Sequence, residues 1–167
     1  MGVARSRHPR NKTVGAARKA SRSARVPAAS ASDNHRLLVF DIPSDPAATR
    51  DVQKQVIDRL ESLGYDEQNV FAIRLALEEG LMNAIKHGNK LDRRKSVHVE
   101  AKLTPQRAQI TIDDQGKGFE RTTVPDPCCE ENILRTSGRG ILLMEAYMDK
   151  VQYTRGGRRV KLVKKNA

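Results

Sequence analysis

The 167-residue chain contains no tryptophan and few other aromatic residues, three phenylalanines and three tyrosines. A hydrophobic core must therefore be built mainly from leucine, isoleucine, valine and alanine. No run of 18 or more apolar residues occurs in the chain, so we expect no transmembrane helix. The amino-terminal segment is basic but has no apolar stretch, which argues against a secretory signal peptide.

Cysteine is scarce as well. The two cysteines, Cys128 and Cys129, are neighbours in the sequence, so we expect no disulfide framework. The sequence has no Cys-x-x-Cys pair and no cluster of histidine and cysteine, which argues against a structural zinc site. These features favour a protein of the reducing cytoplasm.

Acidic residues are nearly missing from residues 1–34. This segment carries eight lysines and arginines against the single acid Asp33, so it supplies +7 of the formal net charge of +11. It is rich in serine and alanine and shows no apolar periodicity. The composition predicts a disordered basic tail, because such a segment cannot bury enough apolar surface to offset its ordering entropy.

Several functions remain open for this tail. Its cations can neutralise the phosphates of a nucleic acid or of another anionic surface. A segment rich in arginine and serine also resembles a transit peptide, and the first six residues fit the loose myristoylation pattern. We expect a solvated extension, with nucleic-acid contact kept as an alternative.

Residues 35–167 have the pattern of one α/β domain. Apolar residues recur at helical spacing over 47–64 and 66–88, and a shorter helix is expected over 141–147. Short β-rich runs predict five strands, over 36–42, 96–103, 108–113, 150–154 and 160–163. A loop rich in glycine, proline and acids occupies 115–137. The element order predicts a two-layer α/β sandwich, a mixed and mostly antiparallel sheet with helices on one face.

Two polar residues interrupt the second predicted helix. Glu79 and Asn83 are four residues apart and therefore share one helix face. A carboxylate and a carboxamide in this arrangement can serve as a general base and as an oxygen ligand for Mg²⁺. The alternative is a solvated helix edge, and the neighbouring Glu78 shows that this edge tolerates charge.

Two further motifs contain glycine, one directly after a predicted strand and one at the start of a predicted helix. In the first, Asp114 ends a strand and Gly116 and Gly118 allow a sharp turn close to a ligand; an aspartate there can accept a hydrogen bond from an exocyclic amine such as that of adenine. In the second, Gly138 and Gly140 open a helix whose free N–H groups suit phosphate. Each motif alone is equally consistent with a simple turn or helix start.

The three motifs in this order resemble the N, G1 and G2 boxes of GHKL ATPases, the histidine kinase-like superfamily. They read Glu-x-x-x-Asn on a helix, Asp-x-Gly-x-Gly-Phe after a strand, and Gly-x-Gly before a helix. The phrase L-x-L-E-E-x-x-x-N-A-I-x-H-G and the ending S-G-R-G-I-x-L-M-x-x-x-M-D-x-V are similar to the anti-sigma-factor serine/threonine kinase branch. The resemblance covers residues 36–164.

The resemblance implies ATP and Mg²⁺ as cofactors and assigns a role to each motif residue. Glu79 matches the general base and Asn83 the Mg²⁺ ligand. Asp114 matches the aspartate that reads adenine, and residues 119–137 match a mobile lid. The remaining matches are glycines beneath the base and beside the phosphates, with an arginine between the latter: Gly116, Gly118, Gly138, Arg139 and Gly140.

The resemblance also implies a function and partners. It implies a protein serine/threonine kinase that sequesters a sigma factor and phosphorylates an anti-anti-sigma protein of the STAS type, with a homodimer as the assembly. A partner-switch module that binds ATP without kinase activity is the alternative. A basic nucleic-acid-binding protein would leave the three motifs unexplained. No helix with a phosphoacceptor histidine precedes the motifs, and His87 is expected to be structural.

Overall fold

The structure of the protein is a computed structural model that describes Gly2 and residues 37–118 and 139–166. The predicted tail over 1–34, apart from Gly2, lies outside the described residues. So do the predicted lid over 119–137, the two cysteines within it, and Gly138.

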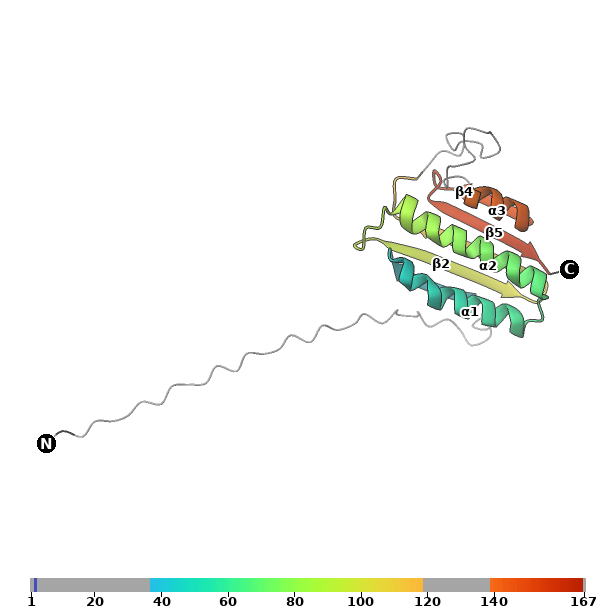
Figure 1. Ribbon diagram of the computed structural model, residues 1–167, viewed down its shortest axis with the longest axis horizontal. Coiled ribbons are helices and arrows are strands. Elements are labelled where there is room, and N and C mark those ends of the chain that lie inside the picture. The colour runs from blue at the N-terminus through green and yellow to red at the C-terminus, as the bar shows by residue number, and fades with distance from the viewer. Residues whose placement is uncertain (1, 3–36, 119–138, 167) are drawn as a thin grey trace.

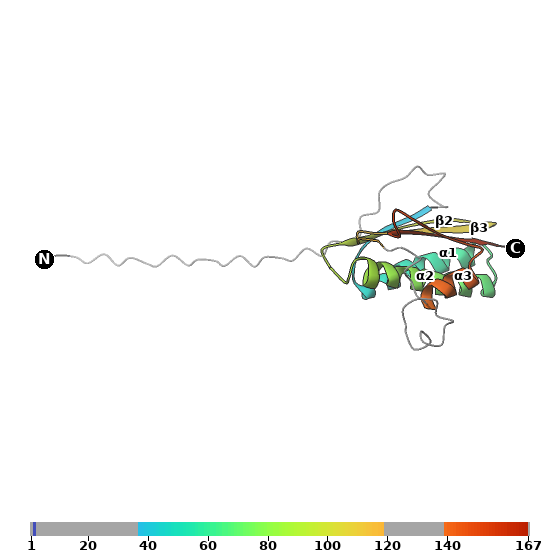
Figure 2. The same ribbon diagram turned by 90° about the horizontal axis from the view of Figure 1, so that it is seen from above.

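The described chain folds into two layers, a sheet and a layer of helices (Figures 1 and 2). The strands are β1 (Leu37–Pro43), β2 (Ser96–Thr104), β3 (Arg107–Asp114), β4 (Lys150–Thr154) and β5 (Arg159–Lys165). The helices are α1 (Thr49–Ser62), α2 (Glu67–Met82) and α3 (Arg139–Tyr147), with a 3₁₀ turn at Pro46–Ala48 and a π-helix at Asn83–Gly88. The strand order is β1-β2-β3-β5-β4.

The predicted α/β sandwich is confirmed. Every strand pairing among the described residues is antiparallel, and the helices lie on one face of the sheet (Figure 2). The expected element order is also observed, with bounds that differ from the expected ones by a few residues. None of the helices in the described ranges has the length and apolar character needed to cross a membrane.

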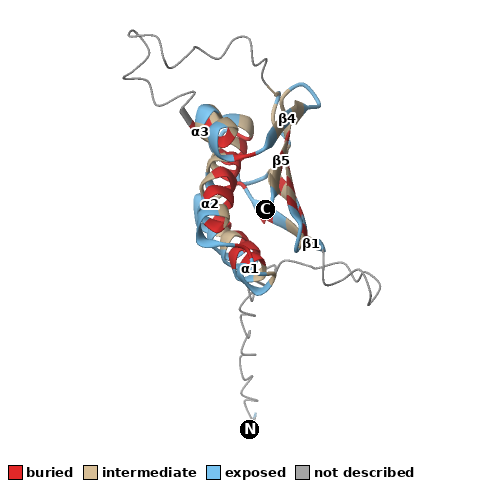
Figure 3. Ribbon diagram, turned by 90° about the vertical axis from the view of Figure 1, so that its right-hand side faces the viewer, coloured by how far each residue is buried: buried red, intermediate tan, exposed pale blue. Residues whose placement is uncertain are grey.

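The core lies between the sheet and the helices (Figure 3). Strand residues alternate between the two faces of the sheet, and those that face the helices are apolar and buried, as Val97, Val99, Ala101 and Leu103 of β2 are. The helices contribute the apolar positions that the periodicity predicted: Val52, Val56, Ile57, Leu60, Val70, Ile73, Leu77, Leu81 and Ile85. On β2 and β3 the alternate positions, which face away from the helices, carry polar side chains such as His98, Glu100, Gln109 and Thr111.

Helix α2 begins where the sequence predicts. The Asp66 side chain caps the helix by accepting a hydrogen bond from the Asn69 backbone N–H at 2.7 Å. Such a cap contributes about 1 kcal/mol to stability. Glu67 is the first helical residue, and its negative charge suits the positive end of the helix dipole.

The last turn of this helix differs from the expected α-helix. Residues Asn83–Gly88 form a π-helix, and the Asn89 N–H donates to the Ala84 carbonyl oxygen, five residues back, at 2.8 Å. Lys90 and Leu91 follow with φ of 57° and 58°, in the left-handed region. Short π segments are frequent at functional sites, and this one begins at a residue of the first motif.

Candidate functional site

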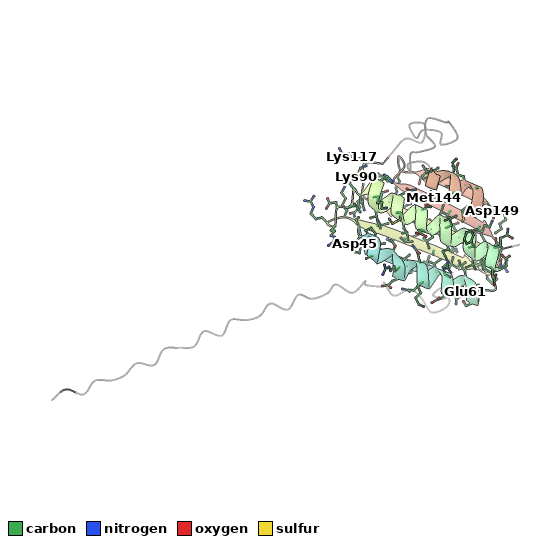
Figure 4. The ribbon with its side chains drawn as sticks, in the orientation of Figure 1. Asp45, Glu61, Lys90, Lys117, Met144 and Asp149 are labelled. Carbon is green, nitrogen blue, oxygen red and sulfur yellow. The ribbon has the colours of Figure 1, made fainter. Side chains whose placement is uncertain are left out.

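The described motif residues meet at one end of the molecule. The π-helix that continues α2, the carboxyl end of β3 and the amino end of α3 all lie there (Figure 1). Figure 4 shows Lys90 and Lys117 at this end, and Asp149 and Glu61 at the other. Both lysines are exposed, so the end that carries the motifs also carries positive charge.

Helix α3 lies against the polar pair of α2. A Cβ atom built on Gly140 would overlap Glu79 Oε2, and it would lie 3.1 Å from Glu79 Cδ and 3.6 Å from Asn83 Nδ2. The structure therefore places the Glu79 carboxylate and the Asn83 carboxamide directly beside the first turn of α3. A side chain at position 140 would therefore force the Glu79 carboxylate to move.

Glu79 and Asn83 are only partly buried. Among the described residues, neither side chain has a hydrogen-bond partner. A carboxylate and an amide beside the backbone of a helix start are therefore free to contact a ligand. The structure thus places the first motif next to Gly140 of the third.

Asp113 and Asp114 lie on opposite faces of β3, since alternate strand residues point to opposite sides. Asp113 faces away from the helices and accepts from Arg159 at 2.6 Å and from Arg155 at 2.8 Å. Asp114 pairs in register with Val97, a buried residue that faces the helices. Asp113 therefore forms ion pairs with the two arginines, whereas the Asp114 carboxylate faces the helix layer that carries Glu79 and Asn83.

Backbone from two segments packs closely around the Asp114 carboxylate. Its Oδ1 accepts from the Gly116 N–H at 2.7 Å. A Cβ on Gly88 would lie 2.5 Å from Asp114 Oδ2 and 2.6 Å from Oδ1, so the end of the π-helix packs against the carboxylate. Among the described residues, no donor reaches Oδ2. That oxygen remains available to an amine of a ligand.

The pKa of Asp114 is raised above its usual value. Burial of the half-buried carboxylate is the main cause, and the negative charge of Asp113 adds to it. The Gly116 N–H and the positive charges of Arg158 and Lys95 act in the opposite direction. A hydrogen-bond donor from a ligand would stabilise the charged form of a carboxylate placed in this way.

The second glycine of the motif contacts the β4–β5 turn. Gly118 has a φ of 81°, and a Cβ there would overlap the Gly156 carbonyl oxygen. In the same turn the Arg158 carbonyl oxygen accepts from the Asp114 N–H at 2.9 Å. The turn between β4 and β5 therefore supports the loop that follows β3.

Sequence reasoning missed Asn89. This residue is completely buried, and its side chain bonds to Ser44, to the Ser96 carbonyl oxygen and to the Gln115 N–H. It also missed the contact of Gly88 with Asp114, because Gly88 was assigned only the end of a helix. Both contacts join segments far apart in the sequence, and no local pattern signals them.

Part of the predicted site lies beyond the described residues. Gly138 and the lid over 119–137 fall outside them, and Arg139 is described only as the first residue of α3. The roles of Glu79, Asn83 and the glycines remain predictions, although the geometry brings the described ones together.

The donor set suits a magnesium nucleotide. Among the described residues, no group of three or more His, Cys, Asp or Glu forms a metal cage. Mg²⁺ is bound in phosphate-transferring sites by one or two protein oxygens together with substrate phosphates, so the single amide oxygen of Asn83 fits this mode. Gly140 is buried, and the Glu79 carboxylate fills the space beside it and next to Asn83 that a Cβ would take.

Comparison with known proteins agrees with this geometry. The model of the histidine kinase-like ATPase domain matches residues 42–164. An anti-sigma F factor of Clostridium perfringens is 32% identical over 96 residues, which cover 56% of this chain and 69% of that protein. The serine-protein kinase RsbW of Bacillus subtilis is 21% identical over 126 residues, or 72% of this chain and 79% of that protein.

A solved structure supports the fold. The RsbU and RsbW domains of a Mycobacterium tuberculosis protein superpose with a TM-score of 0.54 at 19% identity. The match covers 78% of this chain and 32% of that longer one. The family model spans most of this chain and includes every described motif residue. The chain therefore belongs to the histidine kinase-like ATPase domain family.

Proposed function

We propose that the protein is an ATP- and Mg²⁺-dependent serine/threonine kinase that acts as an anti-sigma factor in the cytoplasm. It would bind a sigma factor and phosphorylate an anti-anti-sigma partner of the STAS type. The observation that carries the proposal is the position of Gly140 against Glu79 and Asn83. Relatives named anti-sigma F factor and serine-protein kinase support the same assignment.

The motif residues and two exposed lysines each have a role in this proposal. Asp114 accepts a hydrogen bond from the adenine amine, and the exposed Lys90 and Lys117 attract the phosphates. Asn83 would hold Mg²⁺ through its amide oxygen, and the ion would supply positive charge beside the phosphates. The backbone around Gly138 and Gly140 donates N–H groups to the phosphates at the start of α3.

Glu79 is the proposed general base. A serine or threonine hydroxyl of the partner attacks the terminal phosphorus, its proton passes to the Glu79 carboxylate, and the bond to the bridging oxygen of ADP breaks. The partly buried carboxylate has no hydrogen bond among the described residues. It therefore keeps its lone pairs for the incoming hydroxyl.

A partner-switch module that binds ATP without kinase activity is the second candidate. It uses the same nucleotide contacts and differs only in the transfer step. Relatives that carry the name of an anti-sigma factor support binding of a sigma factor in either case.

Incubation of the full chain with labelled ATP, Mg²⁺ and candidate partners tests the two functions. A kinase labels a serine or threonine of an anti-anti-sigma partner. Nucleotide-dependent partner binding without a labelled product would contradict the kinase assignment and support the ATP-binding module. Failure to bind ATP by calorimetry would contradict both.

A further inference from the structure

Asn89 is a buried polar residue directly after the π-helix. Its side chain is 0% exposed and bonds to three separate segments. The side-chain amide donates to Ser44 Oγ at 2.7 Å and to the Ser96 carbonyl oxygen at 2.9 Å. Its Oδ1 accepts from the Gln115 backbone N–H at 2.8 Å. Asn89 thereby joins the end of β1, the start of β2 and the loop after β3.

The bond to Gln115 reaches the proposed nucleotide contact. Gln115 lies between Asp114 and Gly116, and the Gly116 N–H holds Asp114 Oδ1 at 2.7 Å. The hydrogen bond from the Gln115 N–H to Asn89 therefore fixes the loop that orients the Asp114 carboxylate. Gln115 also accepts a hydrogen bond through its side chain, from the Ser96 N–H to Oε1 at 3.0 Å. Because the Gln115 side chain is exposed, water competes for this bond.

The backbone of Asn89 also fixes the segment on the other side of the Asp114 carboxylate. Its N–H closes the π-helix on Ala84 at 2.8 Å, and the preceding Gly88 packs against the Asp114 carboxylate. Lys90 and Leu91 are then held in the left-handed region, a strain that persists only where surrounding contacts enforce it. One residue thus ties down both sides of Asp114.

We propose that Asn89 is a positioning residue that fixes the Asp114 carboxylate and thereby makes the site selective for purines that carry an exocyclic amine. The inference rests on the proposed function, in which Asp114 binds the adenine amine. Asn89 does not touch the nucleotide; it acts through Gln115 and Gly88. Its loss would affect recognition of the base more than binding of the phosphates.

Two nucleotides separate this role from a general structural one. ATP carries the 6-amino group, and purine riboside 5′-triphosphate lacks it but keeps the ring and the phosphates. Calorimetry with Mg²⁺ and the full chain gives both dissociation constants. For the wild-type protein we expect ATP to bind about tenfold more tightly or better, as a hydrogen bond to a charged group implies. For Asn89→Ala we expect this preference to fall to nearly one, with a much smaller change for the analogue.

Two further variants complete the test. Asn89→Ser removes the same acceptor with a smaller cavity, for the case that the alanine variant does not fold. Ser44→Ala removes a partner of Asn89 but leaves the bond to Gln115, so it should lower the melting temperature and keep the wild-type preference. A folded Asn89 variant with the wild-type preference would overturn the inference, as would an equal loss in Ser44→Ala.

Hydrogen exchange in the wild-type protein adds a measurement that needs no variant. The Gln115 amide should exchange slowly, because its acceptor is buried; fast exchange would overturn the inference. If wild-type protein binds ATP and the analogue equally, the proposed role of Asp114 fails and this inference fails with it. If the preference exists and survives in the folded Asn89 variants, only the inference fails.

Discussion

The two ends of the candidate site are built differently. At the end proposed for the base, Asp114 accepts a backbone hydrogen bond, packs against Gly88 and is tied through Gln115 to the buried Asn89. At the end proposed for the phosphates, the Glu79 and Asn83 side chains have no hydrogen-bond partner among the described residues. One end is organised before a ligand arrives, and the other has polar groups that a ligand would satisfy.

This difference suits phosphoryl transfer. Protein groups that are already ordered around Asp114 bind the base with little loss of conformational entropy. Free polar groups at the phosphate end can adopt the geometry that metal, phosphate and incoming hydroxyl require together. Substitutions at the base end should therefore change affinity, whereas substitutions at the phosphate end should change transfer.

The largest effect is expected for Glu79→Gln. The amide keeps the shape of the side chain but cannot take a proton, so phosphate transfer to the partner should fall by about 10²- to 10⁴-fold. ATP affinity should stay close to that of the wild-type protein. Single-turnover transfer and calorimetry measure the two quantities. Glu78→Gln, one residue away on the exposed side of α2, is the matched control and should remain active.

Full transfer activity of Glu79→Gln would show that another residue is the general base, and Glu78 would be the next residue to test. A parallel loss of affinity and transfer would mean that Glu79 organises the pocket, and the contrast between the two ends would no longer hold.

Gly140→Ala should be the next most damaging change. The added methyl group would overlap the Glu79 carboxylate, and displacement of a reacting group by about 1 Å can cost about 10²-fold in rate. The double variant Glu79→Ala with Gly140→Ala removes the overlapping carboxylate. Gly140→Ala should therefore cost less free energy of unfolding in the Glu79→Ala background than in the wild-type protein, which a double-mutant cycle by urea unfolding reports. If the losses of the two single variants simply add, the overlap with the Glu79 carboxylate is not the reason that Gly140→Ala is damaging.

Asp114→Asn tests the base end. An amide at this position loses the charged acceptor, so ATP affinity should fall by about ten- to a hundredfold, while affinity for inorganic triphosphate should hardly change. Asp113→Asn is the matched control: it loses the ion pairs with Arg155 and Arg159 and should lower stability without changing ATP affinity. Equal effects of both substitutions would contradict the assignment of Asp114.

The same residue predicts a pH dependence. The folded-state pKa of Asp114 is raised by burial, so the carboxylate takes up a proton at a higher pH than an exposed aspartate does. A protonated carboxyl is a poorer acceptor for an amine. ATP affinity should therefore fall as the pH is lowered through this raised pKa, and Asp114→Asn should remove that part of the pH dependence.

Local patterns in the sequence predicted the elements and the residues of the three motifs. Helical periodicity located α2 and placed Glu79 and Asn83 on one face, and a β-rich run followed by glycines placed Asp114 at a strand end. These features depend on residues close in sequence. The π-helix, the packing of Gly88 on Asp114 and the role of Asn89 depend on contacts between distant segments. An asparagine after a glycine has the pattern of an ordinary turn, and only the structure shows that it is buried.

The smallest effect is expected on the open face of the sheet, where His98 pairs in register with Asp113 and lies on the side opposite to Asp114 and the helices. His98 Nδ1 lies 2.8 Å from Asp41 and Nε2 lies 3.1 Å from Glu100. Burial lowers the pKa of His98, but the hydrogen bonds to the two carboxylates outweigh it, and the pKa is raised above 6.5.

Because the folded-state pKa of His98 is raised, the interaction stabilises the fold fully below pH 6.5 and is lost as the pH rises through the folded-state pKa. The side chain is 36% exposed, so the contribution should stay below about 1 kcal/mol. Urea unfolding at several pH values should show a difference between wild-type and His98→Gln protein that shrinks as the pH rises. ATP affinity should be the same in both. A change in ATP affinity would show that the open face of the sheet is energetically coupled to the site. The comparison of the two ends of the site would then have to include this face as a third region.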